Sequence, residues 1–157
     1  MIRNRPVHLQ PGLKQFLHFC MDNFNVGIWS SMMPNNLSPL VELICRVSSI
    51  GPTAFCFIYN QTNCEAVLGG NPKKPHVPLL TKPFCKIQIA YDPLNTLLID
   101  DTPAKGKCNG ENTCISPIEY DGNPRDNFFE TRLIPYLDSL AKSTLNVPDF
   151  VYQNSFM

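Results

Sequence analysis

Hydrophobic and polar positions alternate along the chain in short blocks that predict helices and strands in turn. Apolar residues spaced three and four apart predict a helix over residues 12–23. Ser38 is expected to cap a second helix, with Pro39 at its first position, and Asp126 to cap a final one. The residues expected on the buried faces of these helices are Leu13, Phe16, Leu17 and Cys20; Leu40, Leu43, Ile44 and Val47; and Phe129, Leu133, Tyr136, Leu137 and Leu140.

Short apolar runs between the helices predict strands at residues 25–29, 54–59, 95–101 and 112–116, with a further short element within 79–90. The run 95–101 is uninterrupted and ends in two acids, a pattern typical of a parallel strand buried on both faces. Helices alternating with such strands predict an α/β fold, with a mostly parallel sheet flanked by helices. We expect a single domain over residues 1–157.

Residues 60–78 form the segment with the weakest periodic pattern. It contains Gly69-Gly70-Asn71-Pro72 and the lysine pair Lys73-Lys74, so it is rich in turn-forming and basic residues. The segment is expected to be a flexible loop, either a disordered insert or a surface for a protein partner.

Composition narrows the class of protein. The 157 residues are 43% hydrophobic and 17% charged, which allows a packed core. A formal net charge of zero argues against nucleic acid as a partner, and no apolar stretch approaches the roughly 20 residues of a membrane span. Seven cysteines without a Cys-x-x-Cys pair, several in apolar runs, predict buried free thiols in a reducing compartment. The expected location is therefore intracellular, in the nucleus or cytoplasm, with the mitochondrion as the alternative.

Three groups of polar residues are candidates for chemistry. Asp100 and Asp101 end a buried strand, where a divalent cation would relieve their repulsion. The alternative is an acidic strand end that caps the next helix through Asp101 or Thr102. Ser30 and Ser31 also follow a strand and could hold a phosphate, or simply form a turn. Lys82 could neutralise a phosphoryl group or be solvated. The three histidines have no metal-like or triad-like spacing.

In order along the chain, these pieces resemble a known family. The residues that carry the resemblance are Arg5-Pro6, Phe16-Leu17-His18-Phe19-Cys20, Val26-Gly27-Ile28-Trp29-Ser30-Ser31, Leu79-Leu80-Thr81-Lys82, Thr96-Leu97-Leu98-Ile99-Asp100-Asp101-Thr102-Pro103, Asn109, Ile115-Ser116-Pro117 and Leu133-Ile134-Pro135-Tyr136-Leu137. Together they are similar to the plant-type FCP1/SCP-like (NLI-interacting factor) phosphatases of the haloacid-dehalogenase (HAD) superfamily. The likeness runs from about residue 5 to residue 141.

The resemblance implies a HAD-like, Rossmann-type fold and a phospho-aspartyl mechanism. By this likeness Ser30 would hydrogen-bond the transferring phosphoryl group, with Ser31 beside it, and Lys82 would offset its charge. Asp100, beside Asp101, would help to hold Mg²⁺. The implied substrates are phosphoserine or phosphothreonine residues in proteins.

The family's first motif, Asp-x-Asp, provides the nucleophile, and the sequence contains no Asp-x-Asp. We interpret the chain as starting too late to include it, so that the first-motif strand is missing from the centre of the sheet and its neighbours have open edges. Without the nucleophile no phospho-enzyme can form. Remaining Mg²⁺ binding is therefore expected to be weak or absent.

These features lead to a predicted function and to alternatives. The prediction is a catalytically inactive, truncated FCP1-like protein that acts by binding a protein or phosphopeptide. One alternative is a Mg²⁺-dependent protein phosphatase completed by a strand from another chain or by a homo-oligomer. Another is a binding subunit similar to the family's mitochondrial presequence-import receptor, and the last is an unrelated α/β binding module.

Overall fold

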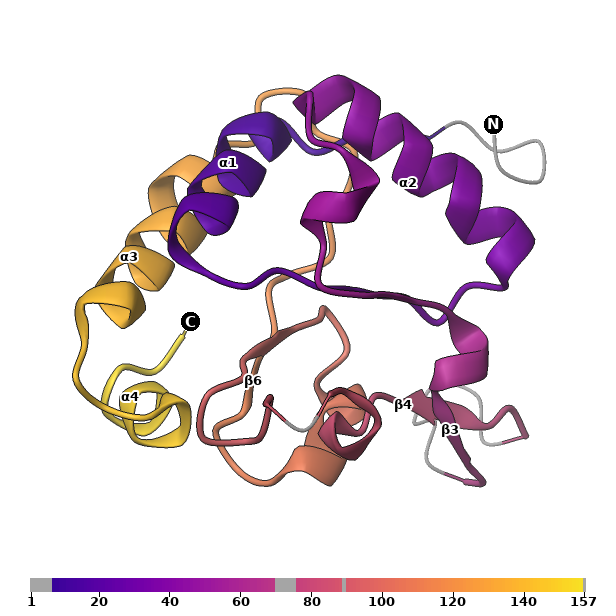
Figure 1. The fold of residues 1–157 in the computed structure, drawn as a ribbon, viewed down its shortest axis with the longest axis vertical. Helices are drawn as coiled ribbons and strands as arrows, with labels where there is room; N and C mark the ends of the chain where they lie inside the picture. Colours follow the sequence, from indigo (N-terminus) through magenta and orange to yellow (C-terminus); the bar gives the residue numbers. More distant parts are fainter. Residues whose placement is uncertain (1–6, 70–75, 89, 157) are drawn as a thin grey trace. The chain divides into compact units, whose positions relative to one another are not determined.

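The computed structural model describes residues 7–69, 76–88 and 90–156. It has a mixed α/β fold, with short strand pairs and α-helices connected by 3-10 turns (Figure 1). The chain divides into two compact units, each built from two stretches of sequence. The first unit comprises Met1–Gln61 and Tyr120–Ala141, and the second comprises Thr62–Glu119 and Lys142–Met157. The expectation of a single domain stays a prediction.

The first unit is built around helix α1, Leu13–Asn23, whose predicted face is confirmed. Leu17 and Cys20 are buried, and Leu17 forms a hydrophobic core with Ile50 and Phe55. The ring of Phe16 stacks on that of Phe129 with the centroids 4.5 Å apart, which joins the two stretches of sequence within this unit.

Helix α2 spans Pro34–Ser48 and begins earlier than the sequence pattern predicted. Met33 is its N-cap residue, Pro34 lies in the first turn, and Pro39 lies inside the helix. The predicted Ser38 cap is therefore wrong: its hydroxyl instead donates to the Pro34 carbonyl one turn earlier, at 3.1 Å. Because Pro34 already fits the first turn of a helix, it competes with the Ser38-Pro39 start signal.

The earlier start also changes the buried face of α2. The helix buries Leu37, Val41 and Ser48, whereas Val47, predicted to face inward, is 42% exposed. The Ser48 hydroxyl is satisfied by the Ile44 carbonyl at 2.6 Å, so a polar side chain fits the buried end of this helix.

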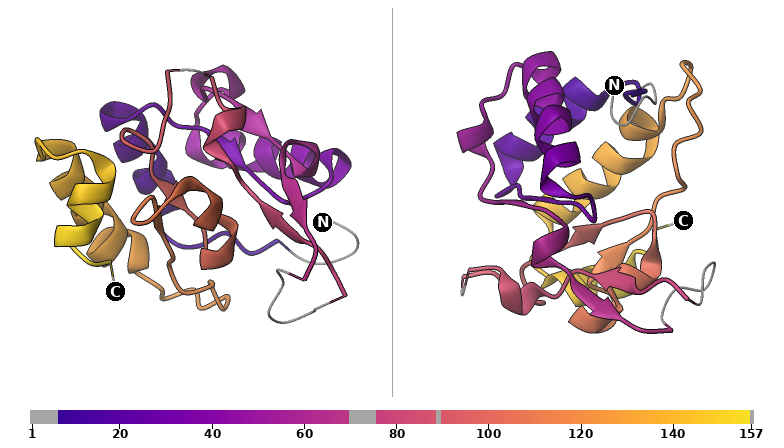
Figure 2. Two further views of the ribbon diagram at one scale, coloured as in Figure 1. Left: turned by 90° about the horizontal axis from the view of Figure 1, so that it is seen from below. Right: turned by 90° about the vertical axis from the view of Figure 1, so that its right-hand side faces the viewer.

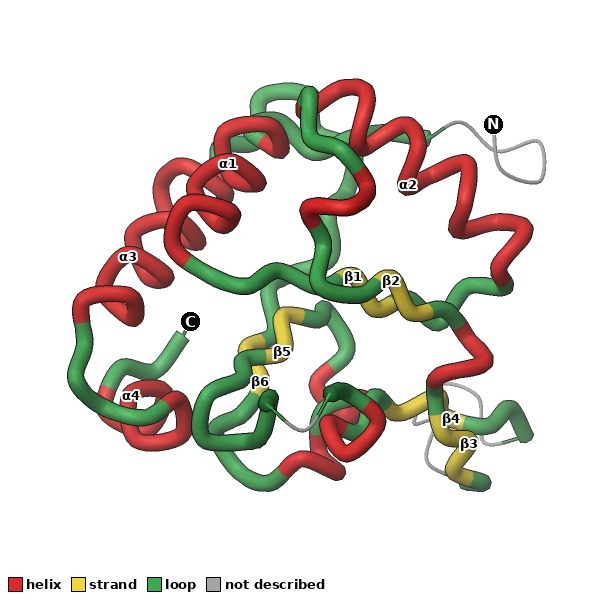
Figure 3. The backbone as a smooth tube through the Cα atoms, in the orientation of Figure 1, coloured by secondary structure: helices red, strands yellow, loops and turns green. Residues whose placement is uncertain are grey.

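Strands β1, Ile28–Trp29, and β2, Ile58–Tyr59, pair in parallel as expected (Figure 3). Each covers only the last residues of its predicted run. Gly27, directly before β1, has no room for a side chain, because a Cβ there would lie 2.3 Å from the ring of Phe57. The rings of Phe57 and Tyr59 both meet Trp29 edge to face, which packs the end of this strand pair.

The second unit contains a second parallel pair, β5, Leu98–Ile99, with β6, Cys114–Ile115. This pairing confirms the parallel strands predicted within residues 95–101 and 112–116, although each strand is only two residues long. Most of the surrounding chain consists of 3-10 turns: η3, Phe84–Lys86; η4, Pro103–Lys105; and η5, Lys107–Asn109. Such short turns leave many backbone N–H and C=O groups without a backbone partner, so side chains must form hydrogen bonds with them.

The loop predicted over residues 60–78 is wrong for part of its length. Within the described residues, it contains the turn η2, Gln61–Asn63, and the strand β3, Glu65–Val67. Strand β3 pairs antiparallel with β4, Leu79–Thr81, and this ribbon can be followed in Figure 2. Tertiary pairing overrides the weak local pattern here. The lysine pair of this segment lies outside the described residues.

The C-terminal helices differ from the prediction at their starts and in number. A π-helical turn, η6, Phe129–Leu133, leads into α3, Ile134–Lys142, without a side-chain cap. Asp126 instead accepts a hydrogen bond from the Gln10 side chain at 2.6 Å. Phe129, Leu133 and Leu137 are buried as expected. Helix α4, Val147–Gln153, was not predicted, and Asn146 caps it by accepting from the Asp149 N–H.

All seven cysteines are free thiols, as expected, but their burial was predicted incorrectly. Cys20 alone among them is buried, and burial raises its pKa to about 12. Cys56, Cys85 and Cys108 are exposed. In the extended stretch before β2, the buried side chain is Phe55 and the neighbouring thiol points to solvent, as alternation along an extended chain requires.

Candidate functional site

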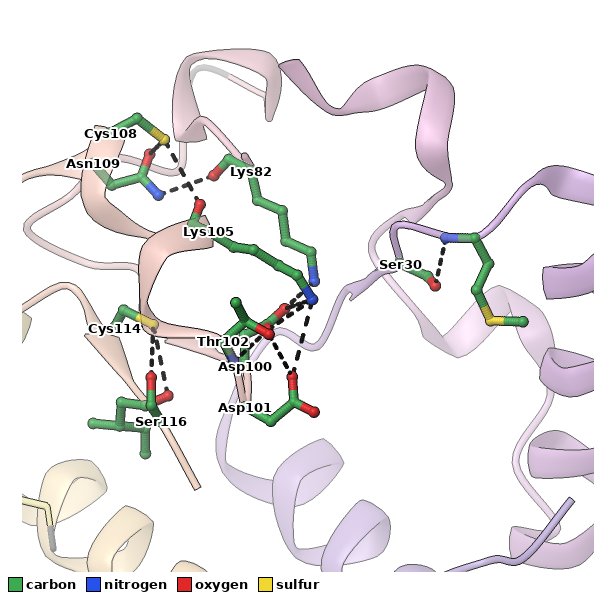
Figure 4. A network of polar contacts seen from close by, with 12 residues as sticks. Ser30, Lys82, Asp100, Asp101, Thr102, Lys105, Cys108, Asn109, Cys114 and Ser116 are labelled. Atoms are coloured by element: carbon green, nitrogen blue, oxygen red, sulfur yellow. Dashed lines mark hydrogen bonds and ion pairs between the residues drawn. The ribbon is translucent and has the colours of Figure 1, made fainter. Parts of the chain in front are cut away.

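The strongest polar cluster lies in the second unit and centres on Asp100, directly after β5. Its side chain is 6% exposed, and one carboxylate oxygen accepts a hydrogen bond from the ammonium of Lys82 at 2.5 Å. The Lys82 side chain is 5% exposed, so both charges are buried (Figure 4). The structure thus brings together two of the predicted site residues, separated by 18 positions in sequence.

A second ammonium contacts the same carboxylate. Lys105, at the end of η4, lies 3.0 Å from one oxygen of Asp100 and 3.5 Å from the other. The backbone N–H of Thr102 donates to Asp100 at 2.9 Å. Sequence reasoning did not select Lys105. The signal that could have found it is the Thr102-Pro103 start of a tight turn, which folds the chain back onto the preceding carboxylates.

The electrostatics of Asp100 follow from these contacts. Burial by itself raises the pKa of this carboxyl. The hydrogen bond and charge of Lys82, the Thr102 N–H and the charge of Lys105 together outweigh burial, so the pKa lies below its ordinary value. Asp100 is therefore a stable carboxylate at neutral pH and not a general acid.

Backbone contacts fix where Lys82 stands. Its N–H donates to the carbonyl of Lys105 at 3.0 Å, and its own carbonyl accepts from the side-chain amide of Asn109 at 2.9 Å. The amide oxygen of Asn109 also accepts from the Phe84 N–H at 2.7 Å. Asn109 is buried, so one side chain completes the hydrogen bonding of two backbone groups that have no strand partner.

Asp101 is placed differently from its neighbour. Its side chain is 43% exposed and accepts from the Thr102 hydroxyl at 3.1 Å, while the Lys105 ammonium lies 3.9 Å away. Lys105 therefore stands against both carboxylates of the Asp100-Asp101 pair. The next helix is the three-residue 3-10 turn η4, and Thr102 is its N-cap residue, as one form of the capping alternative expected. No side chain makes a capping hydrogen bond there.

The predicted Mg²⁺ site does not fit this arrangement. A cation on Asp100 would approach within about 4 Å of two ammonium groups, where even two unit charges repel by about 4 kcal/mol near a protein surface. Mg²⁺ also needs near-octahedral oxygen ligands, and no group of three or more His, Cys, Asp or Glu side chains suited to a metal occurs in the described residues. With the lysines in place, Asp100 and Asp101 are better suited to ammonium than to metal.

Ser30 and Ser31 belong to the first unit, directly after β1. Ser30 forms a turn in which its hydroxyl accepts from the Met32 N–H at 3.1 Å. The hydroxyl of Ser31 is buried and has no hydrogen-bond partner among the described residues. The turn interpretation of Ser30 is thus confirmed locally, and phosphate binding by this pair stays a prediction.

A separate pocket of about 250 Å³ lies beside the cluster in the second unit. Its lining is mostly apolar, and Asn109 forms part of it. The lining residues are Pro83, Phe84, Cys85, Tyr91, Asp92, Pro93, Cys108 and Asn109. Burial raises the pKa of Cys108, which argues against a reactive thiolate in this pocket.

No helix of the described residues has the length and apolar character needed to cross a membrane. No curated protein sequence matches the chain significantly. The family model for NLI interacting factor-like phosphatases matches residues 2–148, nearly the whole chain. The match agrees with the residues that carry the resemblance and with the short parallel strand pairs. This chain therefore belongs to the NLI interacting factor-like phosphatase family.

Proposed function

We propose that this chain binds a phosphorylated protein segment without hydrolysing it, and that Lys82 is the residue at the centre of recognition. The observation that carries the proposal is the buried Lys82–Asp100 pair with a second ammonium from Lys105. Two cations around one buried carboxylate leave a local excess of positive charge, which a phosphate dianion can use. The carboxylate of Asp101 brings the formal charge of the four side chains to zero, but it is 43% exposed and therefore screened by water, so binding is expected to be weak.

The absence of hydrolysis is proposed on chemical grounds. Phosphatases of this family generally use Mg²⁺, and a phospho-aspartyl mechanism needs an aspartate free to attack phosphorus. The sequence holds no Asp-x-Asp. The carboxylate of Asp100 is engaged by two lysines, which make it a poor nucleophile. The residues of this cluster can hold an anion but offer no group to form the covalent intermediate.

The test is a titration of the ¹⁵N-labelled chain with O-phosphoserine, with serine as the matched ligand lacking the phosphate. Phosphoserine should shift the amides of Lys82 and Lys105 with a Kd in the millimolar range, and serine should not. Lys82→Met should weaken binding at least tenfold, whereas Lys107→Met, which removes an exposed lysine nearby, should leave it unchanged. Equal shifts from serine, or full binding by a folded Lys82→Met variant, would contradict the proposal.

One observation favours a second function, a phosphatase completed by another chain. Within the described residues, β1 pairs with β2 alone and β5 with β6 alone, so each parallel pair keeps an open edge. An open edge is a template for an added strand, from a partner protein or a second copy of the chain.

This second function is tested with p-nitrophenyl phosphate and Mg²⁺, together with the mass of the chain in solution. Turnover that appears in a higher oligomer and is lost in Asp100→Asn would establish the completed phosphatase and overturn the binding-only proposal. A monomer without turnover agrees with binding alone.

A further inference from the structure

Lys105 differs from an ordinary surface lysine in how its position is fixed. Its N–H donates to the Thr102 carbonyl at 3.0 Å, and its carbonyl accepts from the Lys82 N–H at 3.0 Å. Gly106 follows where a Cβ would lie 2.7 Å from the Cβ of Cys114, so the turn can pack this closely only with glycine. Contacts with Thr102, with Lys82 after β4 and with β6 therefore fix the position of the Lys105 backbone. The Lys105 side chain is 21% exposed.

The oxygens of Asp100 have little capacity left. One oxygen accepts from the Thr102 N–H at 2.9 Å and from Lys105 at 3.0 Å. The other accepts from Lys82 at 2.5 Å and lies 3.5 Å from Lys105. A carboxylate offers about four lone-pair positions, and these contacts use nearly all of them. A metal ion could bind Asp100 only by displacing an ammonium.

The placement of Lys105 is that of a bridging cation. Its ammonium lies 3.0 Å from Asp100 and 3.9 Å from Asp101, so one positive charge contacts two adjacent carboxylates (Figure 4). Two neighbouring carboxylates that a divalent cation would otherwise hold are thus neutralised from within the chain.

We infer that Lys105 is a built-in counter-ion that takes the place of a divalent cation at Asp100 and Asp101. The chain therefore keeps this site closed to Mg²⁺ by its own side chain, and removal of Lys105 opens a carboxylate pair to metal. The inference concerns metal exclusion alone and holds whether or not phosphate binds at Lys82.

The experiment is a titration of the full chain with Mn²⁺ alone, followed by water-proton relaxation, with no phosphate present. The wild-type chain should bind Mn²⁺ with a Kd above several millimolar. Lys105→Met should bind at least tenfold more tightly, and Lys105→Gln should show the same direction of change. Lys107→Met is the control for the loss of one positive charge and should behave as wild type.

The gain must come from the carboxylate pair. Adding Asp100→Asn to Lys105→Met should therefore return Mn²⁺ affinity to the wild-type level. Sub-millimolar Mn²⁺ binding by the wild-type chain that Asp100→Asn removes would overturn the inference, and so would folded Lys105 variants that bind no tighter than wild type. Where Asp100→Asn folds poorly, Asp101→Asn provides the same test, because its side chain is 43% exposed and its loss should leave folding intact.

Discussion

The interiors of the two units contain different kinds of contact. The interior of the first is apolar, with Leu17, Ile50 and Phe55 at its centre and aromatic rings around β1. Of the buried polar residues in the described part of the chain, all but Ser48 belong to the second unit: Thr81, Lys82, Asp100, Asn109 and Thr113. Both units bury hydrophobic residues, and the second adds buried charge pairing and side-chain hydrogen bonds to its apolar interior.

This contrast has a physical reason. The first unit has two long helices whose backbone groups satisfy one another, so its side chains are free to form an apolar core. The second has two-residue strands and 3-10 turns, so buried side chains such as Asn109 must complete the backbone hydrogen bonds. The candidate site is therefore buried and hydrogen-bonded within its unit, and changes there should affect stability as well as binding.

The largest effect is expected from Asp100→Asn. It removes one partner of a buried pair and leaves the Lys82 ammonium uncompensated, which costs about 3–5 kcal/mol of unfolding free energy. Urea unfolding measures the loss, and hydrogen exchange should place it at the Lys82 amide in the second unit. Asp101→Asn is the matched control, because its side chain is 43% exposed, and it should change stability by less than about 0.5 kcal/mol. Equal losses of unfolding free energy in the two variants would show that the buried Asp100 contributes no more to stability than the exposed Asp101.

Leu17→Ala tests the first unit in the same way. Deleting a buried leucine side chain typically costs about 3 kcal/mol through lost transfer energy and the cavity left behind. The loss should be independent of salt and should appear in the exchange of α1 amides. Val47→Ala on α2 serves as the control, since this residue is 42% exposed, and it should cost well under about 1 kcal/mol. A large loss for Val47→Ala would restore the face predicted from the sequence.

Gly106→Ala should have a smaller effect, about 2 kcal/mol, by forcing the turn away from Cys114 and Leu98. Thermal unfolding measures it. Gly51→Ala is a control in the first unit, where the nearest atom to a new Cβ is a threonine oxygen at 3.8 Å, and should be nearly neutral. If the turn does hold Lys105, Gly106→Ala should also raise Mn²⁺ affinity, which a purely local defect would not do.

The smallest expected effect is a pH dependence that belongs to the second unit. The folded-state pKa of Asp100 lies below its unfolded value, so its contribution to stability is full above about pH 4 and is lost as pH falls through the folded-state value. The stability difference between the wild type and Asp100→Asn should therefore narrow below about pH 4. Leu17→Ala should show a constant difference over the same range. A constant difference for Asp100→Asn would mean that its pKa is not lowered by folding.

Much of the local structure follows from sequence pattern alone. The periodicity that places Leu17 and Cys20 on one face predicts α1, and the apolar run ending at Asp100 predicts a parallel strand. Where two start signals compete, as at Pro34 and Pro39, local pattern chooses wrongly, because both prolines satisfy the same rule. Strand β3 has three exposed residues and no periodic signal, so only its pairing with β4 reveals it.

The sequence by itself determined the family, the order of the first three helices and of the parallel strands, and the candidates Lys82 and Asp100. Only the tertiary structure showed that these two residues form an ion pair. A lysine 18 positions before Asp100 pairs with it, and Lys105 folds back over both acids from a turn that periodicity does not detect. Residue patterns report local conformation and burial, whereas the partner of a buried charge depends on contacts between distant segments. For that reason the lysine contacts of Asp100 and Asp101 could not be predicted from the sequence pattern.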